Sequence, residues 1–246
     1  MRYFNMPHDI TWKSGNSPVT KADIEVDNFL RETLLAARPD YGWLSEETAD
    51  SPERLGRKRT FVVDPIDGTR AFIDGKDVWC VSIAIVENNR SIAGYLNCPA
   101  RREEYIAVEG GGARMNGRAL TPPKTPPLLR LSGAKPLLEM LPAPFAAKCV
   151  FQPSVPSLAY RIAMIAAGAI DGTLVKPNSH DWDLAAAELI LRECGGALVD
   201  LEGRTPKFAT ENPVHGPLAA ASGPVLSGLL EAAKSIALNL SPAAVY

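Results

Sequence analysis

Two carboxylates, a proline, a glycine and a hydroxyl follow one another in segment 64–69, which reads DPIDGT. The apolar residues Phe61 to Val63 precede it and predict a buried strand that ends in acids. Acidic side chains are almost never buried unless they are paired or bind a cation. A strand end is also a rigid place to hold oxygen ligands for a hard divalent cation. If a helix begins at Gly68 and Thr69, its free N–H groups form an anion site beside that cation. A metal and a phosphate side by side indicate a phosphatase.

Further acids stand at the edges of other predicted elements, namely Asp23, Glu46, Glu47 and Asp183. Each has an ordinary alternative explanation. Asp23 could complete a capping box that begins at Thr20, Asp183 could cap its own helix, and the two glutamates could be a solvated pair. Together, however, four separated segments each bring an acid to the edge of a regular element, as in a multi-oxygen magnesium site. No basic cluster of matching density accompanies segment 64–69, so salt bridging explains it poorly.

The composition excludes several other classes of protein. A net charge of -2 gives no electrostatic reason to expect nucleic acid or a membrane as a partner. The 4 cysteines and 3 histidines are scattered without a C-x-x-C pair, which predicts buried thiols in a reducing cytoplasm rather than a zinc or disulfide framework. No apolar run approaches the roughly 18 residues that cross a membrane. We therefore expect a cytoplasmic protein.

Hydrophobic periodicity predicts the elements that position these residues. A helix runs from Thr20 to Pro39, and Gly42 begins a short strand. Glycine and Asn-Gly pairs near 110–117 predict hairpins. The remaining elements are strands at 80–86, 91–97, 104–108, 172–175, 197–201 and 217–221 and helices at 157–169, 182–194 and 225–238.

Seven prolines lie between Leu120 and Pro144, which is the best candidate for a boundary between two halves of the chain. We expect an N-terminal α+β half, 1–125, that carries most metal ligands. The C-terminal α/β half, 126–246, carries Asp183 and the substrate side. The two halves would form one functional unit.

Four segments together carry a family resemblance. They are 17–23 (SPVTKAD), 43–47 (WLSEE), 64–69 (DPIDGT) and 182–186 (WDLAA). In this order they resemble the motifs of the inositol monophosphatase family, whose members are Mg²⁺-dependent, typically lithium-sensitive phosphomonoesterases. The wider superfamily includes bisphosphate nucleotidases and fructose-1,6-bisphosphatase. The resemblance implies an α/β (α+β) fold, a layered αβαβα sandwich, and a homodimer.

The resemblance also implies the metal ligands. Glu46, Asp64 and the Ile66 carbonyl would bind one Mg²⁺, and Asp64, Asp67 and Asp183 would bind a second, with Asp64 bridging the two. A third, more weakly bound ion would be held by Glu46 and water molecules. Glu46 is therefore counted among the catalytic residues as well as among the metal ligands.

Catalytic and phosphate-binding roles follow from the same resemblance. Gly68 and Thr69 would offer backbone N–H groups to the phosphate. Asp23 and Thr69 would orient and help deprotonate a metal-activated water, which attacks phosphorus in line without a covalent phosphoenzyme.

The substrate side departs from the family pattern. Lys176 stands where many members have a glutamate, seven residues before the last metal-binding aspartate. Ser157 matches a family Gly-Ser pair, but Pro156 replaces its glycine. Arg161 lies where bisphosphate nucleotidases often have a basic residue. Ser157, Arg161 and Lys176 are therefore the predicted substrate-binding residues, and their two cations suit a second phosphate better than a polyol. Alternatively, both cations are solvated surface charges.

The N-terminus also departs from the family pattern, because its first helix is largely absent and Met1 to Phe4 resemble only the end of it. A late start codon or a trimmed sequence would explain this. We expect the loss to expose apolar surface and to affect stability or assembly.

Several functions stay open at this point. Inositol monophosphate is the first candidate substrate and adenosine 3',5'-bisphosphate the second, which Lys176 and Arg161 favour. Histidinol phosphate and fructose bisphosphate are weaker alternatives. A catalytically silent regulatory binding protein on the same fold is the rival from another class, but it would not need the complete set of acids present here. The acidic balance argues against a two-metal nuclease.

Overall fold

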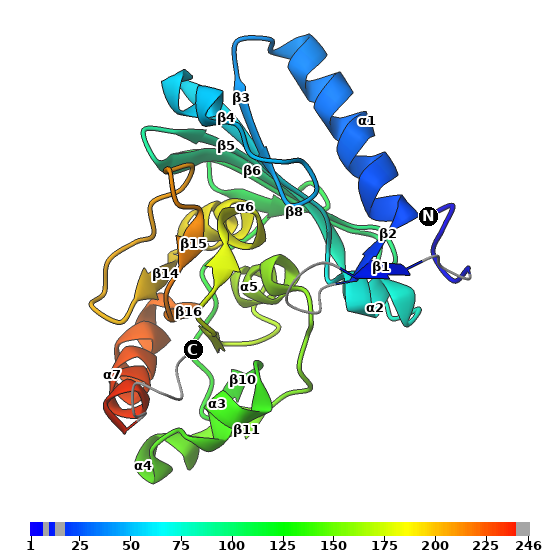
Figure 1. The fold of residues 1–246 in the computed structure, drawn as a ribbon. Coiled ribbons are helices and arrows are strands. Elements are labelled where there is room, and N and C mark those ends of the chain that lie inside the picture. Colours follow the sequence, from blue (N-terminus) through cyan, green and yellow to red (C-terminus); the bar gives the residue numbers. More distant parts are fainter. Residues whose placement is uncertain (7–9, 13–17, 240–246) are drawn as a thin grey trace.

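The computed structural model describes residues 1–6, 10–12 and 18–239. Ser17, which opens the first acidic motif, lies outside the described residues. The molecule is built of five layers. The first is helix α1 (Lys21–Ala37) and the second a seven-stranded sheet. The third is the helix pair α5 (Leu158–Ala166) and α6 (Asp181–Arg192), the fourth a five-stranded sheet and the fifth helix α7 (Gly223–Asn239). Figure 1 shows α1 and α7 on opposite sides of the molecule, with α5 and α6 between the sheets. This is the predicted αβαβα sandwich.

The larger sheet carries the predicted strand of the DPIDGT motif near one edge. Its order is β3-β4-β5-β6-β7-β8-β9; β3 and β4 are parallel, and every other neighbouring pair is antiparallel. Along β5, buried and half-buried residues alternate, as expected for a sheet whose inner face packs on helices. The strands are β3 (Gly42–Ser45), β4 (Arg59–Asp67), β5 (Cys80–Glu87), β6 (Arg90–Cys98), β7 (Glu103–Val108), β8 (Ala113–Met115) and β9 (Arg118–Ala119).

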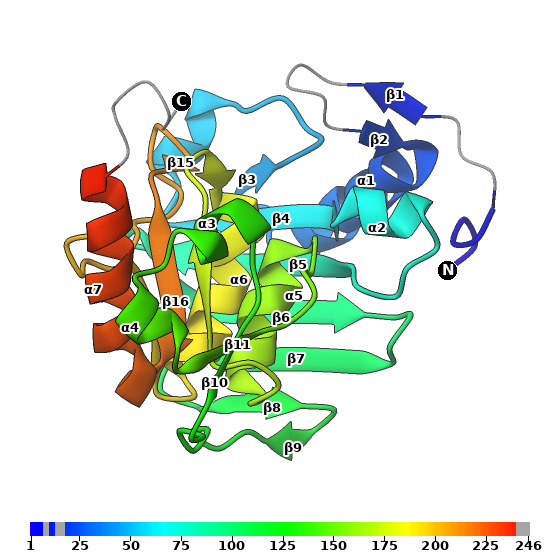
Figure 2. The same ribbon diagram turned by 90° about the horizontal axis from the view of Figure 1, so that it is seen from below.

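The smaller sheet has the order β11-β10-β12-β16-β14 and mixes parallel and antiparallel pairs. One of its faces packs on α5 and α6 and the other on α7. Figure 2 shows α7 running alongside β16 at this end of the molecule. The strands are β10 (Leu129–Leu131), β11 (Cys149–Phe151), β12 (Gly172–Val175), β14 (Gly196–Asp200) and β16 (Leu218–Ser222).

The main hydrophobic core lies around α5 and α6, between the two sheets. Its buried side chains come from both halves of the chain, for example Leu44, Val62 and Leu96 together with Ile162 and Leu189. At Gly94 the backbone of β6 approaches α6 so closely that an added Cβ would lie 2.7 Å from the Ala186 carbonyl oxygen. The glycine therefore lets α6 pack directly on the larger sheet.

Most predicted elements are present, with boundaries that differ by a few residues. The predicted hairpin at Asn116 and Gly117 joins β8 to β9, and both residues have positive φ. β4 continues through Asp67 instead of ending at Asp64, with a register shift between the two acids. The helix predicted at 157–169 is shorter, because Gly168 takes a left-handed conformation just beyond it.

The proline-rich stretch is more structured than its composition predicts. No regular element lies between β9 and β10, yet β10 itself sits inside the smaller sheet. Pro136 and Pro144 occupy the first turns of two short helices, α3 (Lys135–Glu139) and α4 (Ala143–Ala146), where proline is tolerated. The division of the chain at 125 and 126 stays a prediction.

The described N-terminal residues pack beside α2 (Thr69–Ile73). The Phe4 ring lies 5.6 Å from the ring of Phe72 and 5.5 Å from that of Trp79. β1 (Ile10–Trp12) and β2 (Pro18–Thr20) form a two-stranded sheet, as do β13 (Ser179–His180) and β15 (Val214–His215), while η1 (Pro52–Gly56) is a 3₁₀ helix.

All four cysteines are free thiols. In the described part of the chain, no helix has both the length and the apolar character that crossing a membrane requires.

Candidate active site

Asp23 is held at the start of α1 by the predicted capping box. Its Oδ2 accepts hydrogen bonds from the Thr20 N–H at 2.7 Å and the Thr20 hydroxyl at 2.6 Å. The capping role does not exclude the catalytic one, because the Thr69 hydroxyl lies 3.2 Å from Asp23 Oδ1. Burial raises the pKa of Asp23, although these hydrogen bonds oppose the rise.

The irregular end of β4 aims two carboxylates toward α5 and α6. Asp64 Oδ1 accepts the Ile66 N–H at 2.9 Å, which closes a tight turn at Pro65. Beyond Asp67, Gly68 has a φ of 92° and is the N-cap of α2. A Cβ at this position would lie 3.0 Å from that of Ser157, so glycine is required both by conformation and by space.

Asp67 is anchored by the N-terminus of α5. It accepts hydrogen bonds from the N–H of Ala159 at 2.7 Å, the N–H of Leu158 at 3.2 Å and the Ser157 hydroxyl at 2.5 Å. Ser157 also caps α5 and is completely buried. The serine predicted to bind substrate therefore lies beneath Asp67, where it orients that carboxylate.

Asp183 arrives from α6, where its Oδ2 accepts the His180 N–H at 2.7 Å. Oxygen atoms of Asp64, Asp67 and Asp183 all lie within 4.8 Å of one another. Glu46 is not part of that group among the described residues, yet its charge acts on both Asp64 and Asp183. The structure thus joins acids from β4 and α6 and brings the Glu46 segment close to them.

Electrostatics in this cluster favour a bound cation. Burial, and after it the charge of Glu46, raises the pKa of Asp64 well above its ordinary value. Burial, and after it the charge of Asp67, does the same to the pKa of Asp183. Burial raises the pKa of Asp67 as well, although its hydrogen bonds and the charge of Arg161 oppose the rise. All the donors are hard oxygens, which is the ligand set that Mg²⁺ prefers.

A cavity of about 360 Å³ opens beside the cluster. Asp67 and Asp183 line one part of it, and Arg161 and Lys176 line another. The Nε–H of Arg161 is buried and makes no hydrogen bond within the described residues, while its Nη1 donates to the Val155 carbonyl at 2.6 Å. Burial lowers the pKa of Arg161, and the charges of Asp67 and Asp183 oppose that change.

Of the three predicted substrate residues, Arg161 and Lys176 line the cavity and Ser157 does not. The prediction missed Ser154, Asn178 and Ser179, which are polar residues of the same lining. The stretch Lys-Pro-Asn after β12 is a turn signal that could have indicated Asn178, because turn asparagines often project near ligands at strand ends.

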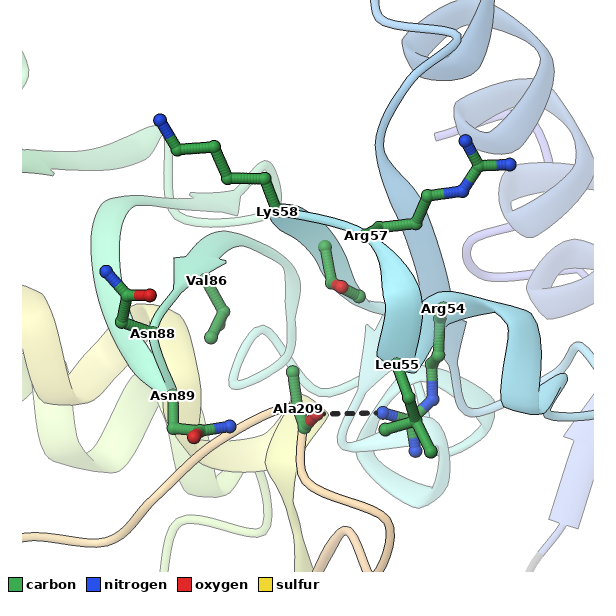
Figure 3. A pocket seen from close by; sticks show the side chains of 9 residues that line it. Arg54, Leu55, Arg57, Lys58, Val86, Asn88, Asn89 and Ala209 are labelled. Atoms are coloured by element: carbon green, nitrogen blue, oxygen red, sulfur yellow. Dashed lines mark hydrogen bonds between the residues drawn. The ribbon is translucent and has the colours of Figure 1, made fainter.

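A second cavity, of about 220 Å³, lies near the opposite end of β4. Its lining includes no acidic residue and therefore offers no comparable cation site. Figure 3 shows Arg57 and Lys58 extending away from Val86 at its centre, and Arg54 donating to the Ala209 carbonyl, a bond of 3.0 Å. This arrangement anchors the loop at 209 and carries none of the predicted chemistry.

The layered fold and the acidic cluster beside a basic cavity define a cation-dependent hydrolase of phosphate esters. Comparison with known proteins agrees, because the sequence model described as "Inositol monophosphatase family" matches residues 1–237. The chain belongs to the inositol monophosphatase family, and it is accordingly a phosphoric monoester hydrolase.

Individual relatives cover most of the chain. An inositol-1-monophosphatase of Rhizobium meliloti is 33% identical over 79% of this chain and 76% of its own. A 3'(2'),5'-bisphosphate nucleotidase of Haemophilus influenzae is 31% identical over 81% and 78%. The solved structure of a Thermotoga maritima inositol monophosphatase superposes with a TM-score of 0.85 over 98% of this chain and 93% of its own. At 22% identity, that likeness supports the fold alone.

Proposed function

We propose that the chain hydrolyses a small phosphorylated metabolite and depends on two or three Mg²⁺ ions to do so. Asp64, Asp67 and Asp183 would hold the ions together with Glu46 and the Ile66 carbonyl. The observation that carries this proposal is the set of three carboxylates whose oxygen atoms lie within 4.8 Å of one another, two of which, Asp64 and Asp183, have a pKa raised well above the ordinary value. Bound Mg²⁺ would supply positive charge for the phosphate oxygens and lower the pKa of a water molecule.

The residues of the chain would position the phosphate and move one proton. Gly68 is the N-cap of α2, so the N–H groups of Gly68 and Thr69 would be able to donate hydrogen bonds to a phosphate oxygen. The Thr69 hydroxyl, in contact with Asp23, would orient the attacking water and pass its proton toward the Asp23 carboxylate. The raised pKa of Asp23 makes it a stronger base than an exposed aspartate.

Inositol monophosphate is our first candidate substrate, since the family match and the Rhizobium meliloti relative both support it. A bisphosphate nucleotide is the second. Arg161 and Lys176 in the cavity favour it, because a second phosphate would meet two cationic side chains there. The Haemophilus influenzae relative is a bisphosphate nucleotidase and supports the same alternative.

The remaining proposals rest on the family resemblance. We propose that the protein is inhibited by lithium, works in the cytoplasm and forms a homodimer. The four free thiols are compatible with a reducing compartment.

The test is phosphate release from inositol monophosphate, adenosine 3',5'-bisphosphate, histidinol phosphate and fructose 1,6-bisphosphate, each with Mg²⁺, with EDTA and with added lithium. We expect Mg²⁺-dependent release from at least one substrate, and the ratio of kcat/KM values ranks the candidates. Release that persists in EDTA would contradict the metal assignment. No release from any phosphate ester would favour the regulatory alternative.

A further inference from the structure

Asp27 is a buried carboxylate that the proposed mechanism does not use. It lies on α1, with 2% of its surface exposed. Its Oδ1 accepts a hydrogen bond from the Ser45 hydroxyl, and its Oδ2 accepts one from the Thr48 hydroxyl at 2.5 Å. Ser45 is the last residue of β3 and Thr48 lies in the segment that follows it, so one side chain of α1 contacts the chain at the end of β3 and again three residues later.

The segment attached by Asp27 is the one that carries Glu46. Glu46 stands between the two hydroxyl residues in sequence, and its N–H donates to the Val63 carbonyl at 3.3 Å. Beyond Ser45 the chain leaves the regular pairing of β3 with β4. The two hydroxyl contacts on Asp27 therefore fix the backbone on both sides of Glu46.

A carboxylate is an expensive group to bury for structural purposes alone. Among the residues that the structure describes, Asp27 forms no ion pair with a lysine or arginine, so hydroxyl groups alone compensate its charge. An ionised carboxylate can accept one hydroxyl hydrogen on each of its two oxygens, whereas an asparagine of the same shape offers one oxygen and places an NH₂ donor at the other position. Asp27 is thus suited to accept the hydroxyl groups of Ser45 and Thr48 together, and these three side chains are called the clamp below.

Helix α1 relates this clamp to the catalytic residues. Asp23 and Asp27 are four residues apart and share the buried face of the helix. Asp23 contacts Thr69 after β4, and Asp27 contacts the segment after β3. One rigid helix therefore sets the position of the Glu46 segment relative to the Asp23–Thr69 pair.

We propose that Asp27 is a positioning residue that holds Glu46 at the metal site. The proposal rests on the proposed function, because it assigns Asp27 a role in cation binding through Glu46. Partners that orient metal ligands typically change metal affinity or activity by about 10–100-fold when they are removed. A residue that only stabilised the fold would change the melting temperature but not the affinity of the folded protein.

The experiment measures Mn²⁺ binding, by the EPR signal of the free ion, for the wild type, Asp27→Ala, Asp27→Asn and the control Glu32→Ala. Glu32 is an exposed acid of the same helix, so its removal changes the net charge equally. We expect the Mn²⁺ affinity of Asp27→Ala to be lower than that of the wild type by about 10-fold or more. Asp27→Asn keeps one acceptor oxygen and should lose less affinity, and Glu32→Ala should bind Mn²⁺ as the wild type does. The Mg²⁺ concentration that gives half-maximal phosphate release should rise most for Asp27→Ala and less for Asp27→Asn. The substrate KM, measured at saturating Mg²⁺, should change less than this Mg²⁺ concentration does.

Wild-type Mn²⁺ affinity in folded Asp27→Ala would overturn the proposal. If Asp27→Ala does not fold, a double-mutant cycle of Asp27→Asn with Thr48→Val decides instead. Losses in Mn²⁺ affinity that are smaller together than their sum would support the proposal. Additive losses would show that Asp27 does not act through the Thr48 hydroxyl and would overturn it. A wild type that binds Mn²⁺ but hydrolyses no phosphate ester would contradict the proposed function and leave the positioning role standing. A wild type that binds no Mn²⁺ would contradict both.

Discussion

Asp64 is the residue on which the site depends most. It is buried, it closes the turn at Pro65, and the charge of Glu46 adds to burial in raising its pKa. A cation is the simplest source of compensation for such a carboxylate. An asparagine has nearly the same shape as Asp64 but replaces one oxygen by an NH₂ group and carries no charge.

Asp64→Asn should abolish most turnover and leave the fold intact. The expected loss in kcat is at least about 100-fold, because a catalytic metal contributes several kcal/mol and about 1.4 kcal/mol corresponds to a factor of ten. Phosphate release and far-UV circular dichroism measure the two properties. Asp40→Asn, an exposed aspartate on the surface, is the matched control and should behave as the wild type. Retained turnover in Asp64→Asn would remove the metal assignment.

A second prediction about a single residue concerns Lys176, and Lys176→Glu tests whether this side chain contacts the substrate. If Lys176 meets a second phosphate, the ratio of kcat/KM for adenosine 3',5'-bisphosphate to that for inositol monophosphate should fall at least about tenfold, since charge-assisted contacts contribute about 1.5–3 kcal/mol. Lys207→Glu makes the same charge change at an exposed site outside the cavity. An unchanged ratio would return Lys176 to the surface-charge interpretation.

At the scale of elements, α6 is positioned by its close approach to β6. Gly94 provides that approach, and Asp183 stands in the first turn of the same helix. A side chain at position 94 would press on the Ala186 carbonyl, which is backbone and cannot rotate away. The packing of α6 on the larger sheet therefore helps to set the position of Asp183.

Gly94→Ala should lower both stability and turnover. Overpacking of this kind costs about 1–3 kcal/mol, which for a chain of this size corresponds to a melting temperature lower by roughly 2–12 °C. We expect kcat to fall as Asp183 moves with α6. Gly56→Ala, where an added Cβ meets nothing within 4 Å, is the control. A stable Gly94→Ala protein with normal kcat would show that α6 does not need this contact.

At the scale of the whole molecule, the acidic cluster should make stability depend on divalent cations. Asp64, Asp67 and Asp183 repel one another in the folded chain and separate on unfolding. At about 100 times its Kd, Mg²⁺ should stabilise the fold by about 2.7 kcal/mol, which corresponds to a rise of roughly 5–10 °C in melting temperature. Differential scanning fluorimetry with MgCl₂ and with NaCl at equal ionic strength measures it. An equal shift in Asp64→Asn would mean that the ion binds elsewhere.

The sequence by itself determined the types of ligand and most local elements. The capping box at Thr20, the acids of segment 64–69 and the Asn-Gly hairpin at Asn116 each depend on neighbours a few residues away. Such patterns act through backbone geometry and short-range hydrogen bonds, so they can be read without the fold. The fold class followed because the motif resemblance spans nearly the whole chain.

Only the tertiary structure decided how distant segments meet. It placed Ser157 beneath Asp67 instead of in the cavity, joined Arg161 and Lys176 in one lining, and gave Asp27 its two hydroxyl partners. It also put β10 inside a sheet, within the proline-rich stretch that had predicted a boundary between the two halves of the chain. These contacts depend on how helices and strands pack across the core, which periodicity within one segment does not encode. A buried carboxylate at helical spacing is therefore a metal ligand, a clamp or a cap according to the residues that the fold brings to it.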